Sequence, residues 1–161
     1  MLNAVIIDDE RHCIETLVWK LNEYCSSVKI LGQFQKSIEA IDFIKKTPNI
    51  DILFMDIEMP NINGFEMLKF IDTHNVKIVL TTAYEKYALD ALKMHVYDYL
   101  LKPIDQLELI KLVNNIEQEH NLRKLPVNAK KVISISTQES IEFVLPQEIL
   151  FCQAHSNYCM I

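Results

Sequence analysis

Short apolar runs alternate with longer amphipathic stretches along residues 1–120. The runs are rich in Val, Ile, Leu and Phe, and nearly every position in them is apolar. Such continuous runs are typical of strands that are buried on both faces of a sheet. We expect five strands, at residues 4–7, 28–34, 50–55, 76–80 and 97–101.

The stretches between these runs repeat their apolar residues every three or four positions, which predicts helices. The first helix is expected from about Glu10 to Tyr24. We interpret Ser37 as the N-cap of the second helix, which stops before Pro48. Further helices are expected from Phe65 to Ile71, around residues 87–92, and from Leu107 to about His120.

Alternation of strand and helix indicates the fold class. Buried strands separated by amphipathic helices predict an α/β fold, a doubly wound five-stranded parallel sheet with helices on both faces. Right-handed crossovers then bring the carboxyl ends of all the strands to one edge of the sheet.

The pattern changes after residue 120. Residues 121–131 form a basic stretch that we interpret as a linker. Residues 132–136 and 141–145 resemble strands joined by a turn near Gln138, and residues 146–151 fit either a strand or a short helix. About thirty residues bury too little surface to form a core alone, so we expect this mostly-β segment to be truncated inside a second domain.

Charge supports the same division. The net charge of −6 alone would disfavour nucleic-acid binding. However, residues 1–120 carry 12 basic and 19 acidic side chains, whereas residues 121–161 carry 4 and 3. A charge step of this kind suggests two units with different roles.

Several classes of protein are excluded by missing motifs. The N-terminus lacks the pattern of a signal peptide, and no apolar run is long enough to span a membrane, so we expect a cytoplasmic protein. The four cysteines show no CxxC spacing, and we interpret them as reduced thiols. The five histidines are scattered and are interpreted as surface or packing residues. Glycine-rich nucleotide-binding loops and the GxSxG motif are absent from the sequence.

Polar residues gather where the predicted strands end. Asp8 and Asp9 follow the first strand, Asp56 ends the third, Thr82 ends the fourth and Lys102 ends the fifth. Ligands of open α/β sheets bind at this edge, where the strand order reverses. In a sheet of order 2-1-3-4-5, that switch lies between the first and third strands, which carry the aspartates.

Each of these residues alone is an ordinary loop residue or helix cap, but together they indicate a chemistry. Three adjacent carboxylates repel one another unless a cation lies among them, and Mg²⁺ is the ion that such oxygen ligands favour. An added ammonium and hydroxyl would complete a site for transferring a phosphoryl group to a carboxylate.

The motifs resemble the signature of two-component response-regulator receiver domains. The residues that carry the resemblance are 6–10, 55–60 with Gly64, 82–83 and 99–103, and they cover about residues 1–120. The resemblance implies that Asp56 accepts a phosphoryl group from a histidine kinase. It also implies that Asp8, Asp9, Asp56 and the backbone carbonyl of Glu58 hold Mg²⁺.

The same resemblance assigns the remaining site residues. Lys102 would contact the phosphoryl group, Thr82 would move to meet it, and Tyr99 would be the aromatic switch residue. Pro60 and Gly64 would shape the loop after the third strand, and the Lys102–Pro103 bond is expected to be cis. Such a protein is a phosphoacceptor rather than an enzyme, with self-catalysed phosphotransfer and slow autodephosphorylation.

The second segment resembles the start of a LytTR-type DNA-binding domain, on residues 145–158. We therefore expect a receiver at 1–120, a linker at 121–131 and an effector fragment at 132–161. The complete effector would bind DNA and regulate transcription, whereas this fragment would not bind DNA specifically.

Phosphorylation is expected to favour a homodimer. The dimer would form through the face made by the expected helix at 87–92, the strand at 97–101 and the helix that follows it.

Two other functions fit part of the pattern. The chain could be a receiver that acts only through protein partners, as a phosphorelay or sink, although 41 further residues follow the receiver. A haloacid-dehalogenase-type phosphatase also uses an aspartyl nucleophile and Mg²⁺. That class requires a second Asp two residues later, where this chain has Glu58.

Overall fold

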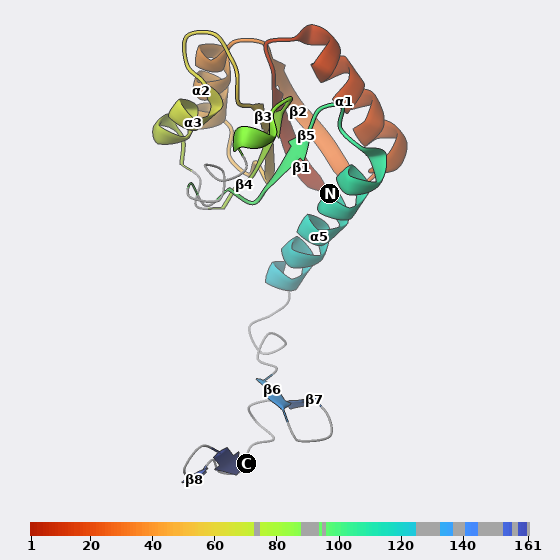
Figure 1. The fold of residues 1–161 in the computed structure, drawn as a ribbon, viewed down its shortest axis with the longest axis vertical. Coiled ribbons are helices and arrows are strands. Elements are labelled where there is room, and N and C mark those ends of the chain that lie inside the picture. Colours follow the sequence, from red (N-terminus) through yellow and green to blue (C-terminus); the bar gives the residue numbers. More distant parts are fainter. Residues whose placement is uncertain are drawn as a thin grey trace. The chain divides into compact units, whose positions relative to one another are not determined.

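A parallel sheet of order β2-β1-β3-β4-β5 organises the N-terminal part of the chain (Figure 1). The computed structural model describes residues 1–72, 75–87, 94, 96–124, 133–136, 141–144, 153–155 and 158–160. The strands are β1 (Leu2–Ile7), β2 (Val28–Phe34), β3 (Ile52–Asp56), β4 (Lys77–Thr82) and β5 (Asp98–Leu101). The predicted fold class and strand order are confirmed.

Helices cover both faces of this sheet. On one face lie α1 (Arg11–Tyr24) and α5 (Gln106–Lys124), and on the other lie α2 (Ser37–Lys46) and α3 (Gly64–Met67) (Figure 1). Short 3₁₀ turns η1 and η2 occur at Leu68–Phe70 and Glu85–Tyr87. Within the part of the chain that the structure describes, no helix has the length and apolar character to cross a bilayer.

The sheet separates two hydrophobic cores. Alternate strand residues point to opposite faces, so Ala4 and Ile6 pack in the core under α1 and α5, while Val5 and Ile7 pack in the core under α2 and α3. All four side chains are almost fully buried. This double burial explains why the strands are apolar at nearly every position.

Helix α3 is shorter than its apolar pattern predicts. Asn63 accepts a hydrogen bond from the Glu66 N–H, and the Glu66 carboxylate accepts one from the Asn63 N–H, which makes a capping box. After one turn the helix tightens into η1, and Ile71 is already extended. The prediction of a helix through Ile71 was therefore wrong.

Ser37 is not an N-cap, which corrects a second prediction. Lys36 holds that position without a side-chain cap, and Ser37 is the first helical residue. Its hydroxyl donates to the Ile62 carbonyl at 2.8 Å and lies near the Met59 sulfur. The serine therefore ties α2 to the loop after β3, a tertiary contact that local sequence does not reveal.

Helix α5 continues to Lys124, beyond the end expected near His120. Its apolar stripe ends at Ile116, whose side chain is buried, and the residues that follow are mainly polar. An apolar repeat predicts which part of a helix packs against the core, but it does not predict where the helix ends. Residues 121–124 of the expected linker are consequently helical, and residues 125–131 lie outside the described residues.

A second compact unit comprises Gln118–Ile161. In it β6 (Ile133–Ser136) pairs antiparallel with β7 (Ile141–Val144), which confirms two predicted strands. A second antiparallel pair joins β8 (Gln153–His155) to β9 (Tyr158–Met160). Three expected segments lie outside the described residues. They are the turn near Gln138, residues 146–151 and most of the helix at 87–92. The three-part domain division stays a prediction.

Candidate functional site

Three aspartates meet at the carboxyl edge of the sheet. Asp8 and Asp9 directly follow β1, and Asp56 is the last residue of β3. One carboxylate oxygen from each lies within 4.8 Å of the others. Asp8 and Asp56 are buried, and Asp9 is partly exposed. The fold thus brings together carboxylates that are 48 positions apart in sequence.

Lys102 places its ammonium between two of these aspartates. Its Nζ lies 2.7 Å from Asp8 Oδ2 and 3.2 Å from Asp56 Oδ2. The residue follows β5, and its backbone N–H donates to the Thr82 carbonyl at 2.7 Å, so the end of β4 fixes its position. The lysine compensates part of the negative charge of the cluster.

Burial and charge have opposite effects on this site. Burial is the main cause that raises the pKa of Asp56 from 3.8 to about 6, although the Lys102 ammonium lowers it and Asp8 raises it further. Burial also disfavours the charged lysine, but the hydrogen bond to Asp8 and the two carboxylates outweigh it. The pKa of Lys102 therefore lies above its usual value. The amine remains a cation at neutral pH.

Backbone N–H groups hold two of the carboxylates in place. The Ile57 N–H donates to Asp56 Oδ1 at 2.8 Å, and the Glu10 N–H donates to Asp8 Oδ1 at 3.1 Å. Ile57 also contacts the Thr81 carbonyl of β4, so the Asp56 environment is anchored to the neighbouring strand. These bonds orient the carboxylates without consuming all of their acceptor capacity.

Thr82 and Tyr99 lie on adjoining strands near the cluster. Thr82 is the last residue of β4 and is buried, and its Oγ1 accepts a hydrogen bond from the Tyr84 N–H at 3.2 Å. Tyr99 is partly buried and packs against the core under α2 and α3. Tyr99 lies on β5, the strand that Lys102 follows, and Thr82, whose carbonyl accepts from the Lys102 N–H, ends β4. The switching role of both residues stays a prediction.

Gly64 allows a close approach of backbone beside Asp56. A Cβ added to Gly64 would lie only 2.6 Å from the Asp56 carbonyl oxygen, which leaves no room for a side chain. The Gly64 N–H also donates to the Ile57 carbonyl at 2.9 Å. The glycine thus allows the start of α3 to close tightly over the end of β3.

Two prolines flank the site. The carbonyl of the exposed Pro60 accepts a hydrogen bond from the Ile62 N–H within the loop after β3. The Lys102–Pro103 peptide bond is cis, as expected.

The sequence pattern does not predict the side-chain contacts of Glu58. The Tyr87 hydroxyl donates to Glu58 Oε1 at 2.7 Å, and Lys86 Nζ lies 3.6 Å from the same oxygen. The contact links the loop after β3 to η2 across 29 positions of sequence. Local sequence patterns carry no signal for such a long-range pair. The exposed carboxylate is therefore paired with side chains of η2.

The donor set of the cluster suits a hard cation. Its ligating atoms are carboxylate oxygens, two of which come from buried residues that repel each other at neutral pH. Mg²⁺ and similar ions prefer such oxygens and retain water in their remaining positions. With Lys102 alongside, the same edge could also neutralise an anionic group such as a phosphoryl group.

Residues 4–114 match the family described as the response regulator receiver domain. An uncharacterized response regulatory protein of Vibrio cholerae is 39% identical over 121 residues, which are 74% of this chain and 50% of that protein. The transcriptional regulatory protein BtsR of Escherichia coli K12 is 36% identical over 98% of this chain and 67% of its own length. The chain thus spans between half and two thirds of these relatives.

Solved structures share the fold. The response regulatory domain of mrkE from Klebsiella pneumoniae has a TM-score of 0.68 at 24% identity, over 74% of this chain and 98% of that one. The CheX–CheY–BeF3–Mg²⁺ complex from Borrelia burgdorferi has a TM-score of 0.64 at 25% identity, over 72% of this chain and 89% of that one. In both cases the similarity covers about the length of the parallel-sheet unit.

Proposed function

The chain belongs to the response regulator receiver family, and on that premise we propose that Asp56 accepts a phosphoryl group from a sensor histidine kinase. The observation that carries this proposal is the buried cluster in which Lys102 contacts both Asp8 and Asp56. The cluster places a nucleophilic carboxylate beside a fixed cation, which is the pairing that phosphoryl transfer to an aspartate requires.

The transfer forms an acyl phosphate on Asp56. One carboxylate oxygen bonds to phosphorus while the P–N bond to the kinase histidine breaks. The electron pair of that bond leaves with the imidazole, which takes up a proton from water. Lys102 stabilises the negative charge on the phosphoryl oxygens, and its raised pKa keeps it protonated for this task.

Mg²⁺ would be held by the carboxylates of Asp8, Asp9 and Asp56, with the Glu58 backbone carbonyl as a further protein ligand. When bound, the ion supplies positive charge for the transferring group. The proposal is supported by the all-oxygen donor set and by the mutual repulsion of the buried carboxylates. The Borrelia burgdorferi complex, whose description includes Mg²⁺ and BeF3, offers a parallel from a related fold.

Phosphorylation would change the side-chain contacts at the carboxyl ends of β4 and β5. A phosphoryl group adds nearly two negative charges and new acceptor oxygens at Asp56. Thr82 would exchange its hydrogen bond from Tyr84 for one to the phosphoryl group, and Lys102 would follow the new charge. Tyr99 would then turn further inward, because it lies on the strand that Thr82 pairs with.

We propose that two copies pair through the face formed by β5, α5 and the segment between η2 and β5. Charged residues of both signs, Asp98, Glu108 and Lys111, line a shallow groove there beside Tyr99. Mixed charges allow the same patch to complement itself across a twofold axis. Sedimentation with and without beryllofluoride should show a shift toward dimer when the receiver is activated.

The whole protein would regulate transcription through a LytTR-type DNA-binding domain that includes residues 132–161. Similarity to BtsR, which is named a transcriptional regulatory protein, extends over 98% of this chain. Such a regulator would act in the cytoplasm. A gel shift with the full-length protein tests this against a phosphorelay or sink that acts only on proteins. Residues 1–161 alone are expected not to bind DNA specifically.

The phosphoacceptor assignment is tested by Asp56→Asn. The wild-type chain with Mg²⁺ and acetyl phosphate should show a retarded band in a phosphate-affinity gel, and the variant should show none, because an amide cannot form the acyl phosphate. Asp42→Asn, which alters an exposed aspartate on α2, is the matched control and should be labelled like the wild type. Labelling of Asp56→Asn would contradict the assignment.

A further inference from the structure

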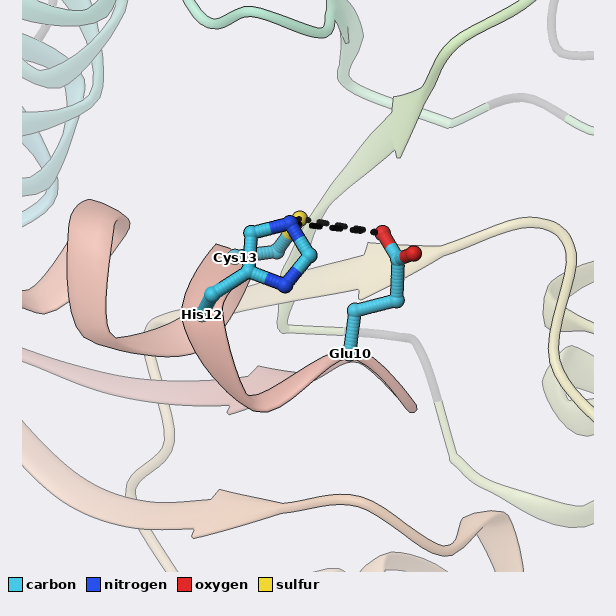
Figure 2. Close-up of side chains that lie close together, drawn as sticks. All are labelled: Glu10, His12 and Cys13. Carbon is cyan, nitrogen blue, oxygen red and sulfur yellow. Dashed lines mark hydrogen bonds and ion pairs between the residues drawn. The ribbon is translucent and has the colours of Figure 1, made fainter.

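Three different metal-binding side chains converge at the start of α1. Glu10 precedes the helix, and His12 and Cys13 lie in its first turn (Figure 2). The Cys13 thiol donates to Glu10 Oε2 at 3.2 Å, and Cys13 Sγ lies 3.5 Å from His12 Nε2. His12 Nε2 lies 3.9 Å from Glu10 Oε2. An oxygen, a nitrogen and a sulfur thus form a small triangle with sides of 3.2, 3.5 and 3.9 Å.

The size of this triangle fits one face of a tetrahedral zinc site. From usual bond lengths, such a face has about 3.4 Å between nitrogen and oxygen and about 3.6 Å from sulfur to either. The three observed separations differ from these values by about half an ångström or less. Small rotations of two exposed side chains, Glu10 and His12, would absorb the difference.

We propose that Glu10, His12 and Cys13 bind a divalent transition metal of the Zn²⁺ class, at a site separate from the aspartate cluster. Thiolate and imidazole ligands select such ions over Mg²⁺, which prefers oxygen. Three protein ligands leave the fourth position of a tetrahedral ion to water.

Backbone structure holds the three ligands close together. They lie within four consecutive residues, and the Cys13 N–H donates to the Glu10 carbonyl at 3.0 Å, so the turn that joins them is closed. The Glu10 N–H is bonded to Asp8 Oδ1. Little chain entropy remains to be lost when an ion binds.

The site is open to solvent on one side. A cavity of about 350 Å³ is bordered by all three side chains and by Asp8 and Lys102. Ions and water can therefore reach the triangle, and an exchangeable fourth ligand has room. The pKa of the Cys13 thiol is raised to about 11 by burial and by the bond to Glu10, so binding must displace the thiol proton.

Cobalt spectroscopy tests the proposal in the complete 161-residue chain. Co²⁺ is added in excess Mg²⁺ to a variant in which Cys152 and Cys159 are replaced by serine, which removes the other unit's thiols. We expect sulfur-to-cobalt charge transfer in the near ultraviolet and the visible bands of tetrahedral Co²⁺. Cys13→Ser should abolish the sulfur band. A Co²⁺ ion among the aspartates would give neither signal.

Zinc affinity, measured by competition with a chromophoric chelator, supplies a second readout. His12→Gln and Glu10→Gln should each weaken Zn²⁺ binding by at least about tenfold. Glu15→Gln alters an acid on the next turn of α1, and Cys25→Ser alters a thiol at the other end of that helix. Both variants should leave the affinity unchanged. Absence of tetrahedral Co²⁺ bands, or equal losses in the two control variants, would overturn the proposal.

Discussion

Asp56 keeps its proton to higher pH in the folded chain than in the unfolded chain. Its pKa is raised from 3.8 to about 6, so between these values the unfolded chain releases a proton that the folded chain retains. Rising pH therefore lowers the stability of the metal-free protein, by up to about 3 kcal/mol, and the loss persists at neutral pH. Bound Mg²⁺ would reverse this loss by favouring the ionised, folded form.

Asp56→Asn removes the ionisation and should show the effect directly. In a chelating buffer at pH 7, the variant should be more stable than the wild type, and the difference should shrink toward pH 4. Urea denaturation across this range measures it. Asp42→Asn, at an exposed position, should show no such trend. A constant difference between pH 4 and pH 7 would contradict the assigned shift.

Position 64 requires glycine because a side chain has no room there, and not because the backbone adopts a positive φ. In Gly64→Ala the new methyl group would press against the Asp56 backbone, which cannot move without shifting β3. The expected cost is about 1–3 kcal/mol in urea denaturation, with slower labelling by acetyl phosphate. Gly32→Ala is the comparison, because its methyl group would meet the movable ring edge of Phe34. Equal costs at both positions would refute this explanation.

Among the elements, the strands were predicted closely from sequence and the helices less so. Strand β1 is apolar at every core position because the sheet is covered on both faces. This burial produces a continuous run of apolar residues that is easily recognised in the sequence. Helix ends depend on other forces. Ser37 bonds to a distant carbonyl instead of capping its helix, and the polar end of α5 remains helical beyond its apolar stripe.

The capping box stabilises the start of the four-residue helix α3. Asn63→Ala removes the acceptor for the Glu66 N–H and should destabilise the chain by about 1 kcal/mol. Chemical denaturation measures this change. Asn114→Ala, on the exposed middle of α5, should be neutral or slightly stabilising because alanine favours helices. A neutral Asn63→Ala would show that packing of Met67 alone holds α3.

At the scale of the molecule, the sheet divides the parallel-sheet unit into two cores that are joined through its backbone. Ile14 belongs to the core under α1 and α5, and Ile78 to the core under α2 and α3. Ile14→Val and Ile78→Val should each cost about 0.5–1.5 kcal/mol and add within about 0.5 kcal/mol when combined.

For comparison, a second pair of substitutions lies within a single core. Leu53 faces Ile78 directly across β3 and β4, so Leu53→Ala combined with Ile78→Val should deviate from additivity. A double-mutant cycle in urea separates the two cases. Strong coupling between Ile14 and Ile78 would mean that the sheet transmits packing changes from one face to the other.

The position of the site followed from topology, whereas its fine structure did not. The four residues end strands or follow them directly, and parallel strands bring such residues to one edge. They are Asp8, Asp9, Asp56 and Lys102. The contact of Glu58 with Tyr87 and the convergence of His12 with Cys13 depend on side-chain directions that strand order does not define. His12 in particular was interpreted only as a surface or packing residue.

Lys102 has a consequence for the order in which the protein is assembled. Its ammonium already lies between two carboxylates, so the folded chain carries an internal counter-ion. We therefore expect the chain to reach its native state without a metal. Domains whose ligands have no such substitute remain unfolded until metal arrives. If the aspartate cluster binds Mg²⁺ as proposed, folding and metal loading would be separate events. The chain would then fold when divalent ions are scarce, and ion supply would govern how soon it can respond.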